Sequence, residues 1–312
     1  MLSRVANNLF WMDRYMERSF GLLNLINTNY NSALESGDYS SWIDILNKYL
    51  NISENFSTPD NYDDTISIID YILFDDTNPN TLLNTITHSR ENARNVQEHI
   101  SRDIWLSTNK YYLYISKKTN RTKFKKSNPI EFLEDLKKFN MIYLSSAYVS
   151  QERGSAYCFM NLGKYLERTI FSIDILTFKI LELSENNQSL VESLFLKNLI
   201  FLMGGYQLYV KTYKSIFNIE NIIEMIIINE FFPRSVKYNL NRITQNIIEL
   251  DQYNQIIGEN ELVFNAKKLQ NTLTYTTINS IKKIGLNSFL FELKNDLNNL
   301  SQLINQRYFS QL

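Results

Sequence analysis

Two similar charged segments contain the residues of this sequence that are best suited to binding or catalysis. They are Met12-Asp-Arg-Tyr-Met-Glu-Arg18 and Leu162-Gly-Lys-Tyr-Leu-Glu-Arg168, which stand 150 residues apart. In the first segment, Arg14, Glu17 and Arg18 have the i, i+3 and i+4 spacing that gathers side chains on one side of a helix. Guanidinium groups gathered in this way suit the binding of an anion, and the carboxylate among them is a candidate catalytic group.

The second segment repeats this order with Lys164, Glu167 and Arg168. The matched order of polar types favours an internal duplication, although two amphipathic helices can also share a few residues by chance. Both readings make Glu17 and Glu167 the candidate catalytic groups. The candidate substrate-binding groups in these two segments are Arg14, Arg18, Lys164 and Arg168.

A third charged group lies in the segment His88-Ser-Arg-Glu-Asn-Ala-Arg94. Arg90 and Arg94 are one helical turn apart, and Glu91 lies on the neighbouring edge. Two planar guanidinium forks suit carboxylate or phosphate recognition. The alternative is a structural lattice in which Arg and Glu side chains pin three helices together.

Pro233-Arg-Ser235 begins another predicted helix, because proline is well suited to the first helical position. Arg234, Ser235 and the backbone amides of the helix start suit an anion. A simple capped helix start is the more common alternative.

The sequence predicts no metal site and no resident cofactor; a carboxylate-rich metal site stays open as an alternative, although no repeated Glu-x-x-His motif indicates one. Its two histidines, His88 and His99, are eleven positions apart, and Cys158 is the single cysteine. A disulfide framework or a multi-cysteine metal site within the chain is therefore excluded, which favours a reducing cytoplasm. Nucleophile-elbow and phosphate-loop motifs are both absent from the sequence.

Composition and patterning predict an all-α fold. Lys and Arg number 32 against 33 Asp and Glu, so there is no global basic field for nucleic acid, and no apolar run is long enough to span a membrane. Gly and Pro number 8 and 4, too few for a many-turned β protein. Helical patterns cover Leu2–Ala33, Tyr39–Phe56, Asp63–Phe74, Asn80–Ile115, Ile130–Ser150, Ser155–Leu183, Leu190–Phe217, Ile219–Asn229, Arg234–Ile257, Glu261–Lys283 and Leu286–Gln311.

These segments predict a multi-helix bundle with an internal helical duplication, forming a single domain over residues 1–312. The helix over Leu2–Ala33 is apolar nearly all round, so we expect it to be central and its charges to be partly buried. The span Asn80–Ile115 has room for a bend near Asn109. The basic segment Lys117–Lys126 is expected to be an exposed loop, which would join halves 1–116 and 130–312.

The chain resembles the alpha-E family of bacterial helical domains. The resemblance spans most of the chain. It rests on residues 1–18, Ser89-Arg-Glu-Asn-Ala-Arg94 with Trp105 downstream, Leu162-Gly-Lys-Tyr-Leu-Glu-Arg168, and Phe232-Pro-Arg-Ser-Val236. The chain departs from the family pattern at Lys164, where the family usually has Arg, and this change weakens a bidentate contact there.

The resemblance implies an all-helical protein that is encoded beside, or fused to, an ATP-grasp protein, in some systems with a transglutaminase-like protein. Such systems are inferred to make or modify peptides by ATP-dependent amide formation. No ATP-grasp region lies within these 312 residues, so ATP and magnesium are implied only for a separate partner.

Together, the residues and the resemblance predict a cytoplasmic component of a peptide synthesis or modification system, either catalytic or accessory. In this hypothesis a charged helical cavity receives a peptide or an acidic small molecule, including a phosphorylated intermediate. The alternative is a noncatalytic helical assembly protein that docks an ATP-grasp partner. Neither hypothesis involves nucleic acid or a membrane.

Overall fold

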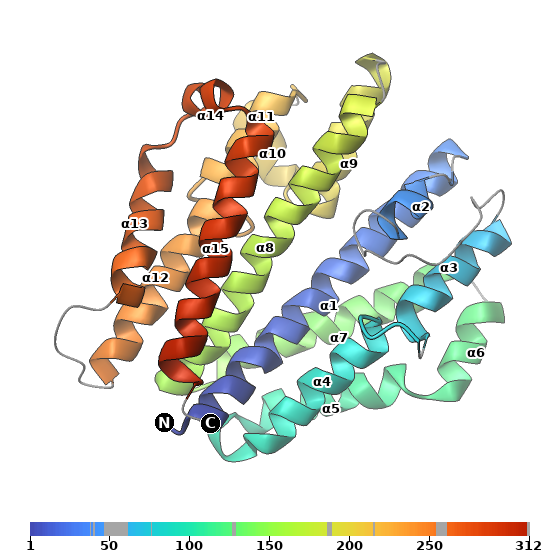
Figure 1. Cartoon of the computed structure of the whole chain (residues 1–312). Coiled ribbons are helices and arrows are strands. Elements are labelled where there is room, and N and C mark those ends of the chain that lie inside the picture. The colour runs from blue at the N-terminus through green and yellow to red at the C-terminus, as the bar shows by residue number, and fades with distance from the viewer. Residues whose placement is uncertain are drawn as a thin grey trace. The chain divides into compact units, whose positions relative to one another are not determined.

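The chain is helical throughout most of the residues that its computed structural model describes (Figure 1). The described residues are 1–37, 39, 41–46, 62–75, 77–126, 129–185, 189–214, 216–253 and 261–310. These ranges contain no strand, which confirms the prediction of an all-α fold. A sequence with few Gly and Pro residues gives long, rarely interrupted helices.

The helices belong to two compact units. The N-terminal unit is Trp11–Tyr157, and the C-terminal unit combines Met1–Phe10 with Cys158–Leu312. The first helix, α1 (Ser3–Ser36), therefore starts in the C-terminal unit and continues into the N-terminal unit. This division differs from the predicted halves 1–116 and 130–312. The basic segment Lys117–Lys126, which was expected to join those halves, lies inside the N-terminal unit.

Within the N-terminal unit, α5 packs against both α4 and α7. One apolar stripe of the Asn80–Ile115 segment is buried there. It consists of Ile86, Ala93, Val96, Ile100 and Ile104. The helices of this unit after α1 are α2 (Ser41–Asp44), α3 (Tyr62–Phe74), α4 (Leu82–Asn95), α5 (Arg102–Ile115), α6 (Lys118–Lys126) and α7 (Pro129–Ser150).

The predicted helix over Asn80–Ile115 is interrupted well before Asn109. Helix α4 ends at Asn95, a single 3-10 turn follows over Gln97–His99, and the Ser101 hydroxyl accepts a hydrogen bond from the Ile104 amide at 3.3 Å. This side-chain cap starts a new helix. The predicted bend near Asn109 is therefore wrong, and Asn109 lies within α5.

The segment Lys117–Lys126 is mostly exposed, as predicted, but the prediction of a loop is wrong, because residues 118–126 form α6. Phe124 is fully buried, and its ring centroid lies 5.4 Å from that of Phe132 and 6.1 Å from that of Phe74. One buried aromatic side chain therefore fixes a helix whose other side chains are mostly polar. The loop prediction relied on the charge of the segment and did not take into account that Phe124 could be buried.

Asp70 on α3 also binds α6 through charged side chains. Both of its carboxylate oxygens accept hydrogen bonds from Arg121, at 3.0 and 2.8 Å, and Lys125 lies 3.0 Å away. Burial acts to raise the pKa of Asp70, but the hydrogen bonds from Arg121 and Lys125 outweigh it and lower the pKa below its usual value. The basic residues thus face an acidic partner within the unit.

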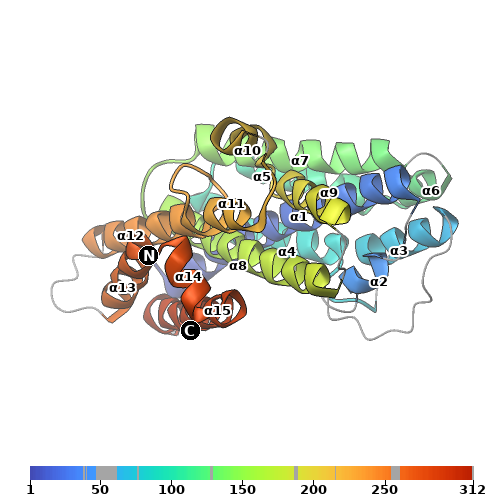
Figure 2. The same ribbon diagram turned by 90° about the horizontal axis from the view of Figure 1, so that it is seen from above.

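The C-terminal unit is built on a long helix, α8 (Ser155–Glu185), which begins three residues before the unit does. In this unit α12 packs against α13, and α13 packs against α15 (Figures 1 and 2). The helices after α8 are α9 (Ser189–Leu202), α10 (Tyr206–Tyr213), α11 (Ile219–Ile223) with a π-helical turn (Glu224–Ile228), α12 (Val236–Tyr253), α13 (Glu261–Tyr275), α14 (Ile278–Ile284) and α15 (Leu286–Tyr308).

Two predicted helices of this unit are each divided in two. The first division lies between α9 and α10, where Gly204 has a positive φ of 66° and Gly205 is closely covered by Met225 and Phe232. The left-handed φ favours glycine at 204, and a Cβ at position 205 would lie 2.6 Å from the Met225 methyl, so Met225 would have to move to admit one. The second division lies before α14, where Thr277 and Ser280 form a reciprocal cap.

Several predicted segments lie partly outside the described residues. The predicted helix over 39–56 is described at 39 and 41–46, where residues 41–44 form α2. The ends predicted at Ile257 and Gln311 also lie outside the described residues. The remaining helices agree with the predicted segments to within a few residues at their described ends.

Candidate functional site

Arg90 on α4 contacts four neighbouring side chains. Its Nε donates a hydrogen bond to Asn109 Oδ1 at 2.8 Å, and its Nη1 donates to Glu91 Oε1 at 2.7 Å. The guanidinium carbon lies 4.6 Å from the ring centroid of Tyr112 and 5.8 Å from that of Trp105. These contacts from α5 hold the planar group in one orientation.

One edge of this guanidinium remains available. Within the described part of the chain, no hydrogen bond engages Nη2 of Arg90, and the side chain is 22% exposed. An oriented donor that is packed against aromatic rings and still partly exposed to solvent suits a carboxylate or phosphate oxygen. The sequence predicted Arg90 from its spacing, but the α5 residues that orient it were not among the predicted site residues.

Arg94 lies one turn further along α4 and shares the same carboxylate. Its Nη2 is 3.1 Å from Glu91 Oε2, so Glu91 bridges the two arginines. The Arg94 side chain is 57% exposed, which places it at the surface of the N-terminal unit. We name Arg90, Glu91 and Arg94 the α4 arginine cluster; its formal charges sum to plus one.

The predicted site residues on α1 are partly buried, as expected. Arg14 and Glu17 are buried, and the Arg14 guanidinium carbon lies 4.6 Å from the ring centroid of Trp11. Arg18 is intermediate in exposure and lies 5.6 Å from the ring centroid of Tyr15. Neighbouring aromatic rings on the same helix thus cover both cations.

A buried polar network joins α1 to α7 and α5 and was missed by the sequence analysis. The Tyr143 hydroxyl donates a short hydrogen bond to the Asp13 carboxylate, and both residues are buried. Burial raises the pKa of Tyr143 well above its usual value, and the charge of Asp13 raises it further, so the phenol stays protonated. Asp13 and Tyr143 are 130 positions apart, so no local pattern in the sequence pairs them.

A second part of this network is uncharged. The Ser19 hydroxyl donates to Asn140 Oδ1 at 2.8 Å, and the Asn140 amide donates to the Tyr111 hydroxyl at 3.2 Å. All three side chains are buried, so their polar groups satisfy one another. Ser89 is also engaged, because its hydroxyl donates to the Met12 carbonyl at 3.0 Å.

The predicted residues on α8 lie in the C-terminal unit. Lys164 donates a hydrogen bond to Asn161, one turn earlier, and its Nζ lies 4.6 Å from the ring centroid of Tyr165. Glu167 is buried, whereas Arg168 lies close to the second predicted anion site. Its Nη1 is 3.5 Å from the carbonyl oxygen of Pro233.

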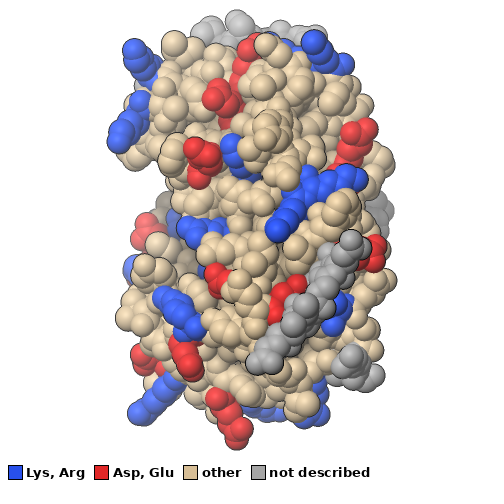
Figure 3. Space-filling view, turned by 90° about the vertical axis from the view of Figure 1, so that its left-hand side faces the viewer, with Lys and Arg blue, Asp and Glu red and all other residues tan. Residues whose placement is uncertain are grey.

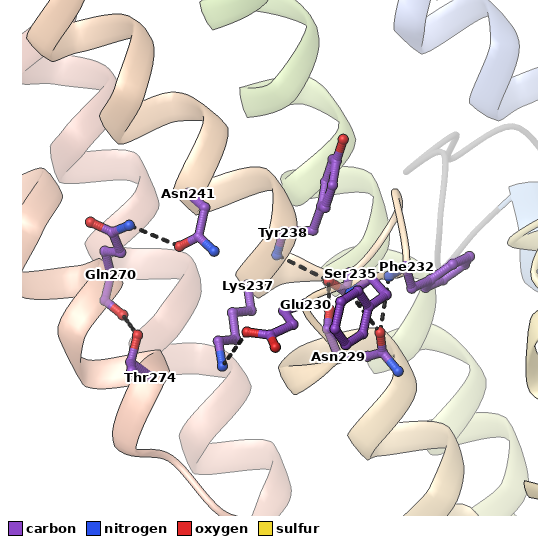
Figure 4. A network of polar contacts seen from close by, with 10 residues as sticks. Asn229, Glu230, Phe232, Ser235, Lys237, Tyr238, Asn241, Gln270 and Thr274 are labelled. Carbon is purple, nitrogen blue, oxygen red and sulfur yellow. Dashed lines mark hydrogen bonds and ion pairs between the residues drawn. The ribbon is translucent and has the colours of Figure 1, made fainter. Parts of the chain in front are cut away.

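The Pro233-Arg-Ser235 turn is tightly bound within the unit (Figure 4). The Ser235 hydroxyl donates to the Asn229 carbonyl and accepts from the Tyr238 amide at 3.0 Å, which makes it a helix cap. Ser172 on α8 donates to the Arg234 carbonyl at 2.8 Å, and Arg234 itself is buried. This geometry is that of a simple capped helix start, which was the alternative to an anion site at this motif.

A network beside this turn extends across α12 to α13 (Figure 4). Asn229 Oδ1 accepts hydrogen bonds from the amides of Phe231 and Phe232 at 2.8 and 2.9 Å. Further along α12, Gln270 donates to Asn241 Oδ1 at 2.9 Å. These contacts stabilise the start of α12 and the α12–α13 packing, and they involve no predicted catalytic group.

The C-terminal unit also has a groove of about 850 Å³ between α8 and α15. An ion pair of 2.6 Å between Asp174 and Lys294 lies at its wall. Burial raises the pKa of Asp174, and the charge of Glu167 on the same helix acts in the same direction. None of the predicted site residues lines this groove.

The structure therefore brings the predicted residues together in separate groups. Arg90 and Arg94 share Glu91, and Arg168 reaches the turn that holds Arg234 and Ser235. Glu17 and Glu167 belong to different units, and their catalytic role stays a prediction.

Neither metal ligands nor a membrane span is found in the described ranges. No group of three or more His, Cys, Asp or Glu side chains is arranged there to hold a metal ion. No described helix is both long and apolar enough to cross a bilayer. On the face shown in Figure 3, basic and acidic side chains are interspersed among uncharged residues.

Comparison with known proteins identifies one family. No curated protein and no solved structure matches the chain. A family model described as a predicted alpha-helical domain with a conserved ER motif matches residues 1–309. The Glu-Arg dipeptide occurs three times in the sequence, at 17–18, 152–153 and 167–168. Because the match covers nearly the whole length, this chain belongs to the Alpha-E family.

Proposed function

We propose that this chain is a component of a cytoplasmic, ATP-grasp-associated system that synthesises or modifies peptides. In this proposal the α4 arginine cluster binds a carboxylate or phosphate group of an acidic, peptide-like intermediate. The association with an ATP-grasp protein rests on the family resemblance. The proposed role in binding rests on the geometry of Arg90.

The observation that carries the proposal is the orientation of the Arg90 guanidinium. Asn109 and Glu91 fix two of its nitrogens, Tyr112 covers its face, and Nη2 is open within the described part of the chain. A guanidinium that is already oriented loses little conformational freedom when an anion binds. The extra positive charge of Arg94 favours a ligand with more than one negative oxygen.

Chemical activation of the intermediate would belong to a separate chain. Amide formation from a carboxylate requires an activated acyl group, and we propose that the ATP-grasp partner supplies it with ATP and magnesium. Glu17 and Glu167 stay candidates for proton transfer, with Arg14, Arg18, Lys164 and Arg168 as neighbouring cations. A transglutaminase-like protein is the further proposed partner.

A noncatalytic assembly role is the second candidate, and specific contacts favour it. Ser235 caps α12, Arg168 contacts the Pro233 carbonyl, and Arg94 pairs with Glu91 on its own helix. Each of these contacts stabilises the fold without a ligand. In this candidate, the buried charges specify helix packing while the surface docks the ATP-grasp partner.

The distinguishing experiment is reconstitution. The chain should be copurified with the ATP-grasp protein encoded beside it, and products formed with ATP and magnesium should be identified by mass spectrometry with and without the chain. A product that requires the chain, and is lost in Arg90→Gln while copurification persists, supports the binding role. Unchanged products in Arg90→Gln would favour the assembly role.

A further inference from the structure

The groove between α8 and α15 has the size of a ligand site. Its volume of about 850 Å³ falls in the range of known small-molecule sites. Both walls belong to the C-terminal unit, with Asp174 and Thr177 on α8 and the other lining residues on α15. In Figure 1 the two helices run side by side, and the ion pair between Asp174 and Lys294 joins them.

The α15 wall of this groove is a stripe of amide side chains with one aromatic ring among them. Asn287, Phe291, Asn295 and Asn298 all line the groove, and at about 100° per residue they fall within an arc of about 80° on the helix. The Phe291 side chain is 67% exposed, so it does not belong to the core of the unit. We name these four residues the α15 stripe.

The neutral polar side chains of the groove are available to a ligand. Within the described ranges, none of the three asparagines of the α15 stripe forms a hydrogen bond, and the same holds for Ser288 and Thr177. By contrast, Asn265 on α13 donates to the Glu261 carbonyl at 2.8 Å. Each amide or hydroxyl offers both a donor and an acceptor, so this lining suits a ligand that also carries both.

The charged residues of the groove favour a positively charged ligand. Asp174 and Lys294 neutralise each other at 2.6 Å. Glu292 also lines the groove, is exposed and forms no ion pair within the described part of the chain. The formal charges of these three residues therefore sum to minus one, which complements a cation. The α4 arginine cluster has the opposite sign, so the two places select different chemical groups.

We propose that the α8–α15 groove binds an extended peptide segment that contains a lysine or an arginine. The asparagines of the α15 stripe pair with the N–H and C=O groups of the peptide, which are amide donors and acceptors like their own. Phe291 packs against a peptide side chain, and Glu292 pairs with the basic residue. The stripe spans eleven positions, or about 16 Å, which is the length of about five extended residues.

Charge also distinguishes a basic peptide from a neutral saccharide. Sugar hydroxyls would suit the asparagines and the exposed ring of Phe291, but they would leave the Glu292 carboxylate without an opposite charge. The groove and the α4 arginine cluster belong to different units, so binding in the groove can be tested separately from anion binding at Arg90.

Peptide binding to the full chain tests the proposal. Isothermal titration calorimetry with acetyl-Ala-Leu-Lys-Leu-Ala-amide should show saturable binding, with a dissociation constant on the order of 100 µM. The same peptide with Glu in place of Lys should bind about fivefold more weakly, because an exposed charge pair contributes modestly. Maltotriose, a neutral trisaccharide, should not bind.

Variants with matched controls locate the binding. Phe291→Ala should weaken binding about threefold to tenfold, whereas Phe264→Ala on α13, at the same 67% exposure, should leave it unchanged. Asn295→Ala should weaken binding at least about twofold, and exposed Asn271→Ala on α13 should not. Glu292→Lys should reverse the preference between the two peptides. Circular dichroism should confirm that every variant remains folded.

The contradicting results are equally specific. If neither peptide bound at millimolar concentration, the proposal would be overturned. Undiminished binding by both Phe291→Ala and Asn295→Ala would place the peptide on another surface. Maltotriose binding that is lost in Phe291→Ala, without peptide binding, would make the groove a saccharide site. Equal affinities for the two peptides, unchanged in Glu292→Lys, would contradict the selection of a basic residue.

Discussion

Arg90 on α4 lies over the ring of Tyr112 on α5, with 4.6 Å between the guanidinium carbon and the ring centroid. The two helices pack directly against each other, so the contact is fixed by the core of the N-terminal unit. A cation over a partly exposed aromatic ring contributes on the order of 0.5–2 kcal/mol. The same contact holds the guanidinium edge in place for an anion.

Arg94→Lys should reduce product formation more than it reduces folding stability. Lysine keeps the charge but loses the planar fork that recognises two oxygens at once. Because Arg94 is 57% exposed, its ion pair with Glu91 should contribute no more than about 1 kcal/mol to stability. Thermal denaturation and reconstituted product formation should be measured on the same preparation.

Equal losses in the two measurements would instead support a structural ion-pair lattice. Full product formation by a folded Arg94→Lys variant would remove Arg94 from the proposed site. Lys110→Arg on α5 is a suitable control, since it is an exposed exchange between basic residues outside the α4 arginine cluster.

Ser235→Ala should lower the free energy of unfolding by about 0.5–2 kcal/mol, as expected for loss of a helix cap. The hydroxyl both donates to the Asn229 carbonyl and accepts from the Tyr238 amide. Ser235→Asn, which retains a side-chain acceptor, should recover part of this loss. If Ser235→Ala instead left stability unchanged and reduced anion binding, the capping role would be contradicted.

The helix positions were predictable because their apolar residues repeat at helical intervals. The break at Val96 was not, because the cap at Ser101 and the 3-10 turn before it depend on local hydrogen bonds. Likewise, α6 was predicted to be a loop because most of its residues are basic or polar. Phe124 is the one residue of this helix that is buried. The spacing of apolar residues predicts where helices form, whereas helix caps and single buried side chains become visible only in the tertiary structure.

Phe124→Ala should destabilise the N-terminal unit by about 3–5 kcal/mol, because it removes a fully buried ring from a three-ring cluster. Lys118→Ala on the exposed side of the same helix should change stability by no more than about 0.5 kcal/mol. Denaturant unfolding of both variants measures the difference. Equal, small effects would restore the solvated-loop interpretation of this segment.

Asp70→Asn should destabilise the protein at neutral pH by about 1–3 kcal/mol, since it leaves Arg121 and Lys125 without their carboxylate partner. The folded pKa of Asp70 lies below the unfolded value of about 4, so its contribution is complete above that value. It is lost as the pH falls through the folded pKa.

The difference in unfolding free energy between wild type and Asp70→Asn should therefore shrink as the pH is lowered from about 6 to 3. A difference that stays constant over this range would show that the charge of Asp70 is not responsible. Exposed Asp103→Asn, on α5, provides a control for general charge effects.

The candidate site was predictable only in part. Arg90 and Arg94 were found from their spacing, because a single turn of helix brings them to one carboxylate. Asn109 and Tyr112, which orient Arg90, lie on another helix and were not found. The buried pair of Asp13 and Tyr143 is separated by 130 positions, so only folding reveals it.

The most direct measurement of the central claim is product formation by Arg90→Lys in the reconstituted system, with thermal stability recorded on the same preparation. Loss of the oriented fork should reduce product formation about tenfold or more, the equivalent of one charge-assisted hydrogen bond, with the ATP-grasp partner still bound. Undiminished product formation by a folded, partner-bound Arg90→Lys variant would contradict anion binding by the α4 arginine cluster.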